Sequence, residues 1–506
     1  MSSDDEPDAF SQLTEAVLSK RPILRELMQK HGQKTLAEYA SLYIDVNLNP
    51  PIHQRQDELI STIRDDVAAR FGQTVGQQVA KQLERYYFVS TSDHHGPIVD
   101  FSFSNANLLA AVSHATHQDP DLAYIIVLAC SSISFRNISF PRGLAYHVVQ
   151  DGVSDIERVS FFPASARSCP VFNFRAYTAN EIEQVKKTIY KKQHQSDVTE
   201  KLIALLDEVY LDPTVLACPT FTDQVTLTNA AIWRKFFLPH TQPTAELLSL
   251  EQETIVTQLL LRYHLDQDTN INHILFDPTY EPLIRQYFDG IMGAFSTAEH
   301  SGSYLFWALP PQSKYRQQLW KKGNTLTTDD GSYHVALTPD ALRAAFERKE
   351  IFPTTMLDFF VLSFYYGLKC LGGFNQINYL THMKNAYIRM NVDRMNYRSI
   401  EVCARAQTKE MSDGYLIAYG QPPAGGVVPV NGIDLYLYGD NQTWPKIQEV
   451  ANTVTINNSL YPAMPEFYRY VYTEQERDPV LAAVTPEQIV IQNQLQTKLK
   501  ACLQLH

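Results

Sequence analysis

Three side chains that can do chemistry directly follow an apolar run near residue 90. The stretch YYFVSTSDHHGP contains Asp93, His94 and His95, and Gly96 and Pro97 shape the turn that comes next. A histidine at the end of a strand can bind phosphate, polarise a carbonyl group or transfer a proton. We therefore take the Asp-His-His triplet as the candidate catalytic group. The alternative is a structural loop in which one histidine makes a hydrogen bond and the other faces solvent.

A second polar loop, FRNISFPRG, provides groups that suit an anionic substrate. Arg142 stands between Pro141, which fixes φ, and Gly143, which permits close backbone approach. The guanidinium fork can bind a carboxylate or a phosphate through two hydrogen bonds. Asn137 in the same loop is a further candidate for substrate binding. The alternative is that these are surface side chains without a ligand.

Two later segments carry further candidate substrate-binding residues. EHSGSYLFWALPPQSKYR ends in a basic group that includes Lys314, and YYGLKCLGGFNQINYL contains a glycine pair ahead of several amide side chains. Adjacent glycines form a tight turn or let the backbone approach a ligand. The candidates from the second segment are Gly372, Gly373, Asn375 and Gln376.

A strand, a helix and a second strand are predicted around the first two loops. RYYFVST is a short apolar strand, residues 105–117 form a helix, and LAYIIVLACSSISF (residues 122–135) is a continuously apolar strand. This order is typical of a βαβ unit in a parallel sheet that is buried on both faces. Because ligands bind outside the carboxyl ends of such strands, we expect residues 93–97 and 136–143 to lie at the same edge of the sheet.

The remaining pattern places this unit inside an α/β protein with helical additions. Residues 8–85 and most of 177–300 show helical periodicity, and TPDALRAAFERKEI begins with a threonine N-cap. SYLFWAL, GSYHVAL, GYLIAYG and GIDLYLYG are predicted strands, and TPEQIVIQNQLQTKLKACLQ is a predicted helix. We predict a Rossmann-like parallel-sheet core at 86–400 with a helical insertion at about 177–300, a helical region at 1–85 and an α+β region at 401–506.

The order of these segments resembles the bacillithiol-forming cysteine-adding enzymes over roughly residues 86–395. In that family a Gly-Gly-Pro-Gly-Glu segment precedes an apolar, aromatic helix late in a nucleotide-binding-like domain. This chain has Gly-Gly-Phe-Asn-Gln at 372–376, and Asp-His-His-Gly-Pro stands where the family has an early Gly-Gln-Gln loop. The resemblance implies an α/β ligand-binding core.

The Asp-His-His triplet also resembles the motif that helps the DHH phosphoesterases hold a metal pair. Two-metal hydrolysis requires several carboxylates around the ions. The DHH family takes them from earlier strands, whereas residues 8–85 of this chain are predicted to be helical. Neighbouring histidines on an extended chain also point in opposite directions, so we assign no metal ligand and keep metal-dependent hydrolysis as an alternative.

The composition excludes several classes of partner. A formal net charge of −12 and the lack of a basic stripe argue against nucleic-acid binding through phosphate neutralisation. The longest apolar stretch, LDFFVLSFYYGLKCL, is too short to cross a bilayer, and the acidic start MSSDDEPDAF is unlike a signal peptide. We therefore expect a soluble, cytoplasmic protein with no nucleic-acid or membrane partner. No cofactor or oligomeric state follows from the sequence.

The function that fits these residues best is a small-molecule enzyme with an α/β core. A ligase- or transferase-like condensation would use a histidine as the acid or base and Arg142 or Lys314 to hold an anionic substrate. The reaction class rests partly on analogy with a fold. Metal-dependent hydrolysis at the Asp-His-His loop and a noncatalytic role in ligand binding or assembly are the alternatives.

Overall fold

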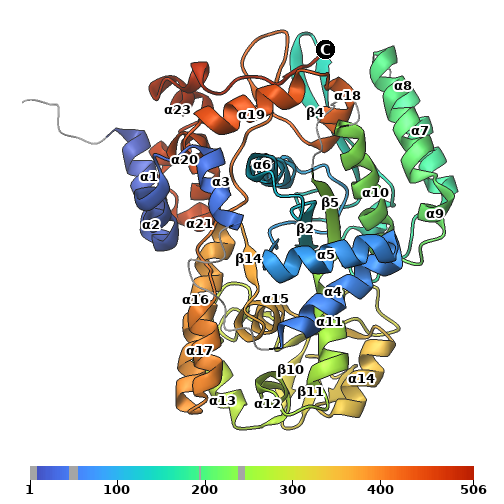
Figure 1. Ribbon diagram of the computed structural model, residues 1–506, viewed down its shortest axis with the longest axis vertical. Coiled ribbons are helices and arrows are strands. Elements are labelled where there is room, and N and C mark those ends of the chain that lie inside the picture. The colour runs from blue at the N-terminus through green and yellow to red at the C-terminus, as the bar shows by residue number, and fades with distance from the viewer. Residues whose placement is uncertain (1–7, 45–54, 193–194, 238–244) are drawn as a thin grey trace, which may run out of the picture.

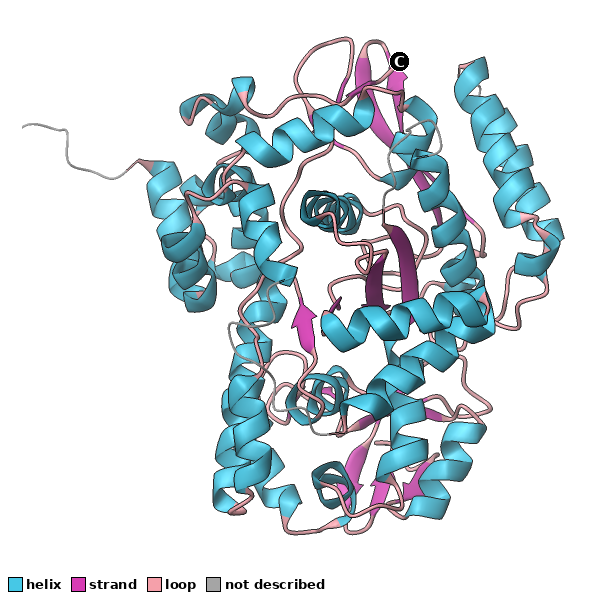
Figure 2. Cartoon of the chain, in the orientation of Figure 1, coloured by secondary structure: helices cyan, strands magenta, loops and turns pink. Residues whose placement is uncertain are grey.

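A four-stranded parallel sheet lies at the centre of the computed structural model, which describes residues 8–44, 55–192, 195–237 and 245–506 (Figures 1 and 2). Its strands are β1 (Phe88–Ser90), β2 (Tyr124–Ala129), β5 (Glu246–Glu251) and β14 (Lys369–Leu371). They are arranged in the order β14-β1-β2-β5, and every neighbouring pair is parallel. The chain therefore builds outward from β1 through β2 to β5 and then returns to the other side of β1. The protein is a mixed α/β protein, as predicted.

The predicted strand–helix–strand unit is confirmed at the start of this sheet. Helix α6 (Phe101–His117) connects β1 to β2. It begins where Asp100 accepts hydrogen bonds from the backbone N–H groups of Ser102 and Phe103, at 2.9 and 3.3 Å. Such a cap satisfies donors that have no partner within the helix. The helix then packs against β2.

Helices cover both faces of the sheet, which explains why its strands are apolar throughout. In β2, Ile125 and Val127 face one hydrophobic cluster, and Ile126 and Leu128 face a second. Helices α6 and α10 (Phe221–Phe237) contribute to the first cluster. The second cluster includes residues of α4 (Gln56–Phe71), α5 (Gln73–Arg85) and α11 (Gln252–Leu259). Alternating side chains of one strand are thus buried on opposite sides.

The described part of the N-terminal region is mostly helical, as predicted. Besides α4 and α5 it contains α1 (Ala9–Lys20), α2 (Pro22–His31) and α3 (Leu36–Ile44). These three helices do not form a separate layer: α3 packs on α6, and α1 packs on α21 (Met464–Val471) near the end of the chain. The first and last parts of the chain are therefore packed together (Figure 1).

The prediction of a helical insertion at 177–300 is only partly right, because β5 lies inside it. The helices of this region are α7 (Ala179–Lys191), α8 (Ser196–Leu205), α9 (Pro213–Leu216), α10, α11, α12 (Asn270–Phe276) and α13 (Tyr280–Phe288). The segment ELLSLE runs straight into α11 with no glycine or proline between them. The apolar residues of strand and helix therefore merge into one pattern, and periodicity alone does not separate them.

An antiparallel hairpin follows the second polar loop. It pairs β3 (Gly143–Gln150) with β4 (Val153–Ser160) around the turn Asp151-Gly152, whose φ values of 52° and 80° suit a two-residue hairpin turn. A Cβ on Gly143 would lie 2.1 Å from the carbonyl oxygen of Val159. Gly143 thus lets the two strands approach each other and does not serve the close approach to a ligand that was expected from its place beside Arg142.

The later predictions have mixed outcomes. SYLFWAL and GSYHVAL contain β8 (Phe306–Ala308) and β12 (His334–Ala336), and α14 (Pro339–Glu347) has the predicted threonine cap at Thr338. Only the end of GYLIAYG forms a strand, β15 (Tyr419–Gln421). The predicted C-terminal helix ends early, since α23 (Pro486–Gln492) is followed by a 3-10 turn and the short strand β17 (Leu503–Gln504).

The prediction of a strand at GIDLYLYG is wrong, because this segment is helix α18 (Gly432–Tyr438). Asn431 and Asp434 form a capping box at its start. Asp434 also accepts hydrogen bonds from the backbone N–H and the ring nitrogen Nδ1 of His147 on β3, at 2.7 and 2.8 Å. Capping and burial against the hairpin thus outweigh the strand propensity of the alternating apolar residues.

The other described helices and strands complete the lower part and the C-terminal part of the molecule. They are β6 (Phe295–Ser296), β7 (Ser301–Gly302), β9 (Gln317–Gln318), β10 (Trp320–Lys322), β11 (Thr325–Thr327), β13 (Ile351–Pro353), β16 (Val428–Pro429), α15 (Thr355–Phe359), α16 (Phe374–Asp393), α17 (Tyr397–Arg405), α19 (Thr443–Thr453), α20 (Ile456–Leu460) and α22 (Pro479–Ala482). None of the helices in the described ranges is both long and apolar enough to span a membrane.

Candidate active site at the carboxyl edge of the sheet

The first polar loop leaves β1 and stays attached to the end of β2. The backbone N–H of Cys130 donates to the carbonyl oxygen of Asp93 at 2.9 Å, and the N–H of His95 donates to the carbonyl oxygen of Cys130 at 2.8 Å. The Asp-His-His triplet is therefore held along the carboxyl edge of the sheet. This is the edge at which open parallel sheets bind ligands.

The second polar loop meets the first at this edge, as the sequence predicted. His94 Nδ1 lies 3.2 Å from the hydroxyl oxygen of Ser139. A Cβ on Gly96 would lie 2.8 Å from the Cα of Pro141, so the two loops are in direct contact there. The side-chain oxygen of Asn137 accepts hydrogen bonds from the backbone N–H and hydroxyl of Ser139, at 3.0 and 2.9 Å.

Asp93 is buried, and its environment suits proton transfer near neutral pH. Its Oδ2 accepts a hydrogen bond from the Asn107 side chain at 2.9 Å, and its Oδ1 accepts one from the Ser92 hydroxyl at 3.1 Å. Burial raises the pKa of Asp93 to about 7, Asp100 nearby adds to the increase, and the two hydrogen bonds oppose it. A carboxyl group with a pKa close to the ambient pH can both give and accept a proton.

The two histidines have different surroundings, but burial lowers the pKa of both to about 4. His95 is fully buried, and its Nε2 donates to the carbonyl oxygen of Thr222 at 3.0 Å. His94 is half-buried, with its ring edge-on to Phe103 at 5.1 Å between centroids. Both rings are therefore neutral at pH 7, and Asp93 is the member of the triplet whose pKa matches neutral pH.

His95→Ala is expected to lower the free energy of unfolding by about 2–4 kcal/mol, because it empties a fully enclosed site. His94→Ala removes a half-buried ring and is expected to cost about 1 kcal/mol. Urea unfolding of both variants at pH 7 measures the difference. A larger loss for His94 than for His95 would show that the assignment of the two environments is wrong.

The glycine pair follows β14 and faces the end of β1. The N–H of Thr91 donates to the carbonyl oxygen of Leu371 at 2.8 Å, and the Gln376 amide donates to the Thr91 hydroxyl. Gly373 precedes the first residue of α16. Gly372, Gly373 and Gln376 thus lie at the edge, as the sequence analysis proposed.

Asn375 has a different partner from its neighbours. Its side-chain oxygen accepts two hydrogen bonds from Arg21, at 2.9 and 3.3 Å from Nη2 and Nε. Arg21 lies at the start of the N-terminal helix α2. Asn375 therefore joins α16 to the N-terminal region through its side-chain oxygen.

Asp413 is a component of the site that sequence reasoning missed. The backbone N–H of the preceding residue, Ser412, donates to the carbonyl oxygen of Gly372 at 2.8 Å. A Cβ on Gly373 would lie 2.8 Å from Asp413 Oδ2, so glycine is needed there to admit the carboxyl group. Burial, together with Asp100 and Asp93, raises the pKa of Asp413 well above its ordinary value. No motif near residue 413 signals this role, because the loop reaches the edge only through the fold.

Aromatic side chains border this acidic corner. Phe374 stacks on Phe467 with centroids 4.1 Å apart, and Tyr470 lies 5.9 Å from Phe374. Tyr470 is 46% exposed, and burial together with Glu466 raises its pKa to about 12. A surface-accessible aromatic group thus lies next to the buried carboxyl groups.

The ends of β2 and β5 are joined by a buried glutamate that the sequence analysis also missed. Glu253 accepts hydrogen bonds from the N–H groups of Ser131 and Ser132, at 2.9 and 2.7 Å, and from the Ser131 hydroxyl at 2.8 Å. Backbone donors at this position bind phosphate in other α/β proteins, but here a side chain of the protein satisfies them. Burial and the neighbouring Glu253 raise the pKa of Glu251 to about 7.

The two cations proposed from the sequence do not reach into the edge. The Arg142 guanidinium donates to the carbonyl oxygen of Phe135 and to the Ser160 hydroxyl, and it covers the Phe140 ring at 4.5 Å from the centroid. Lys314 is exposed, with its ammonium group 5.4 Å from the centroid of the Tyr315 ring. Arg142 is therefore bound within its own loop, and Lys314 faces solvent.

No group of three or more His, Cys, Asp or Glu side chains within the described ranges is arranged to hold a metal ion. The Asp-His-His triplet shows why. His94 and His95 contact different elements, through Ser139 and Thr222 respectively. The arrangement of these side chains thus gives the metal-dependent alternative no support.

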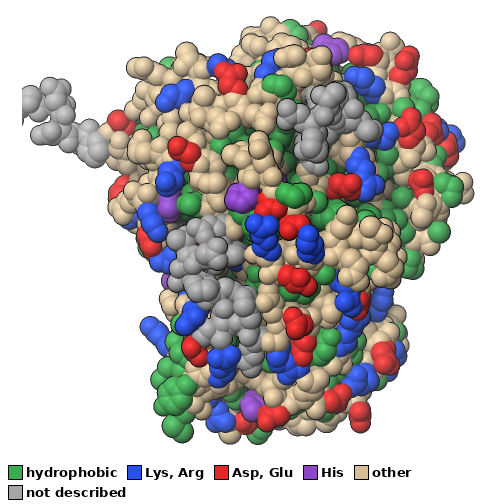
Figure 3. All heavy atoms as spheres, in the orientation of Figure 1, with side chains coloured by type: hydrophobic (Ala, Val, Ile, Leu, Met, Phe, Trp, Pro, Cys, Tyr) green, Lys and Arg blue, Asp and Glu red, His purple; other side chains and the backbone are tan. Residues whose placement is uncertain are grey.

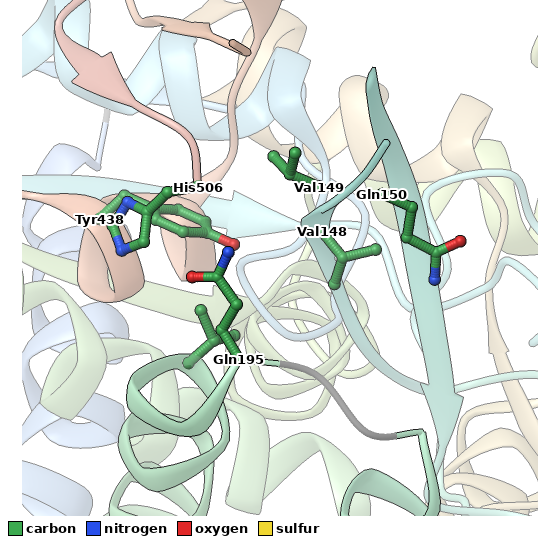
Figure 4. Close-up of a pocket in the computed structure, with 7 residues that line it drawn as sticks. Val148, Val149, Gln150, Gln195, Tyr438 and His506 are labelled. Atoms are coloured by element: carbon green, nitrogen blue, oxygen red, sulfur yellow. The ribbon is translucent and has the colours of Figure 1, made fainter. Parts of the chain in front are cut away.

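A cavity of about 110 Å³ lies away from the sheet edge, next to the β3–β4 hairpin (Figure 4). It is lined by Val148, Val149, Gln150, Gln195, Val198, Tyr438 and His506. These residues come from the hairpin, the start of α8, α18 and the end of the chain, and none of them belongs to the carboxyl edge.

On the face shown in Figure 3, acidic and basic side chains are interspersed.

Comparison of the chain with protein-family models and with curated proteins finds no match.

Proposed function

We propose that the carboxyl edge of the sheet is the active site of an enzyme that acts on a small anionic molecule by acid–base chemistry. The strand order supports this placement, because it reverses between β1 and β14. In open α/β sheets the crevice at such a reversal is where ligands bind. The same order supports the proposal of a Rossmann-like core, in which β1 is central.

The observation that carries the proposal is the position and pKa of Asp93. This carboxyl group follows β1 at the reversal point, and burial raises its pKa to about 7. In a condensation, Asp93 would take a proton from the attacking hydroxyl, amine or thiol as the new bond forms. It would return that proton to the leaving group as the old bond breaks. Burial also raises the pKa of Asp413, which favours the protonated form, the form that can donate a hydrogen bond.

The class of condensation, ligase or transferase, rests partly on analogy of fold, and the resemblance to the bacillithiol-forming cysteine-adding enzymes implies only an α/β ligand-binding core. That resemblance is an analogy of fold and segment order, so it identifies neither a substrate nor a reaction. The Gly372 and Gly373 segment is the part of the resemblance that lies at the proposed site. Asp413, which lies next to Gly373, has no counterpart in that resemblance.

The test is consumption of a metabolite. The purified protein is incubated with a cell extract of polar small molecules that retains its own nucleotides and cofactors, and the mixture is followed by mass spectrometry. We expect the wild type to deplete one compound and form another over time, and Asp93→Asn to form no product. Asp155→Asn, which alters an exposed carboxylate on β4, is the matched control and is expected to behave as the wild type. Equal product formation by Asp93→Asn would contradict the proposal.

A further inference from the structure

We infer that Arg316 binds the anionic group of the small molecule that occupies the carboxyl edge. The inference deepens the proposed function, since it rests on the edge being the substrate site. It names a residue that the sequence analysis did not select, two positions beyond Lys314. The group it would bind is a carboxylate or a phosphate.

The position of Arg316 is fixed by its own hairpin. Strands β8 and β9 pair antiparallel, with Trp307 opposite Gln318. Arg316 ends the loop between these strands, and its guanidinium lies over the Trp307 ring at 4.2 Å from the centroid. One nitrogen, Nη1, donates to the carbonyl oxygen of Ser132 just beyond β2. The stacked ring and the hydrogen bond together orient the guanidinium at the edge of the sheet.

The charge of Arg316 has no carboxylate partner within ion-pairing distance among the described residues. The side chain is half-buried. Burial lowers its pKa, and the nearby Cys130 and Glu253 oppose this decrease, although Glu253 does not lie within ion-pairing distance. Another half-buried arginine, Arg70, shows the usual arrangement, with Asp66 at 2.6 Å and Asp223 at 2.8 Å. Withdrawing a guanidinium from water without an ion pair costs free energy, which a ligand anion would recover on binding.

Two donors of the guanidinium remain open to a ligand. Nε and Nη2 of Arg316 make no hydrogen bond to a described residue, and they are not among the enclosed polar atoms that lack a partner. These two nitrogens form one side of the fork that binds a carboxylate or phosphate through parallel hydrogen bonds. The third nitrogen is the one bound to Ser132, so the free side has a defined direction.

The backbone beside Arg316 limits the kind of ligand that can bind there to one with a single anionic group. The N–H groups of Ser131 and Ser132 are already bound to Glu253. The end of β2 therefore lacks the free backbone donors that cradle a chain of phosphates. A side-chain guanidinium alone suits one carboxylate or one phosphate group.

Isothermal titration calorimetry with two probes, inorganic phosphate and acetate, tests the inference at constant ionic strength in chloride. We expect the wild type to bind one probe saturably, and the preferred probe distinguishes phosphate from carboxylate recognition. Arg316→Lys keeps the charge but loses the fork, so Kd is expected to rise roughly 10- to 100-fold. Arg316→Gln is expected to abolish binding. Arg142→Lys is the matched control, because that guanidinium is bound within its own loop.

Two results would overturn the inference: an unchanged Kd in both Arg316 variants, or no saturable binding of either probe by the wild type. Thermal melting of each variant checks that it is folded, and Arg316→Lys retains most of the side-chain packing on Trp307. The outcome is separate from that of the proposed function. If anion binding depends on Arg316 but the protein consumes no metabolite, the anion site is supported and the proposal of an enzyme is wrong. If Arg316→Gln consumes the metabolite as fast as the wild type, the role of Arg316 is wrong and the proposal of an enzyme is unaffected.

Discussion

Replacing Asp93 with asparagine is expected to stabilise the protein above neutral pH while abolishing turnover. Burial raises the pKa of this carboxyl group from 3.8 to about 7, so the folded state favours the protonated form. The contribution of Asp93 to the free energy of unfolding should therefore be largest below pH 4, and it should decrease as the pH rises to about 7. Three pKa units correspond to about 4 kcal/mol. Asparagine is neutral at every pH and does not carry this cost.

Urea unfolding at pH 5 and pH 8 measures the effect. We expect the loss of stability between these two values to be smaller in Asp93→Asn than in the wild type. Glu251 has a pKa raised to about 7 as well, so part of the dependence should remain in the variant. Asp155→Asn should leave the wild-type pH dependence unchanged. An Asp93→Asn variant less stable than the wild type at pH 8 would show that the carboxylate is stabilised in the folded protein, contrary to the assigned pKa.

Replacing Glu253 with alanine is expected to cause a large loss of stability. The side chain is fully buried and accepts hydrogen bonds from two backbone N–H groups and one hydroxyl. Its removal leaves three donors buried without partners, at about 1–3 kcal/mol each, so a total loss of at least about 3 kcal/mol is expected. The loop after β2 would also lose the contact that fixes it to α11.

Glu246→Ala is the matched control for Glu253→Ala. Glu246 lies at the start of β5, and its ion pair with Arg234 is 41–48% exposed. Exposed ion pairs of this kind contribute about 0–1 kcal/mol, so the control should change little. Chemical unfolding of both variants makes the comparison. Equal losses in the two proteins would show that Glu253 does not hold the end of β2 as described.

The first half of the sheet could be predicted from the sequence because its signals are local. The apolar run at 122–135 and the helix at 105–117 are both long enough to be recognised, and the polar triplet at 93–95 marks the end of β1. Two strands in a βαβ unit are parallel, so their following loops meet at one edge. Residues 93–97 and 136–143 could therefore be expected to meet, and they do.

The second half of the sheet depends on contacts that are distant in sequence. β5 merges with the helical pattern of α11, and β14 is only three residues long. Both are strands because they pair with β2 and β1, which are more than a hundred residues away. Tertiary pairing of this kind decides short apolar segments that propensity leaves ambiguous.

The chemistry of the site could likewise be predicted from the sequence only in part. The histidines drew attention by their type, but their pKa values depend on burial, which no local pattern reveals. Arg142 and Lys314 were plausible from their neighbours in sequence, and Arg316 was not distinguishable from them. Asp413 reaches the edge on a loop that follows α17, over three hundred residues after Asp93. Residue type suggested what could react, and only the fold indicates which groups are close together.

The position of the bound small molecule tests the proposed site most directly. The measurement is a crystal structure of the protein grown with the metabolite that it consumes. We expect that molecule outside the carboxyl ends of β1 and β14, in contact with Asp93 and the backbone of Gly373, with its anionic group on Arg316. A molecule bound in the cavity lined by Tyr438 and His506 (Figure 4), with nothing at the sheet edge, would contradict this assignment.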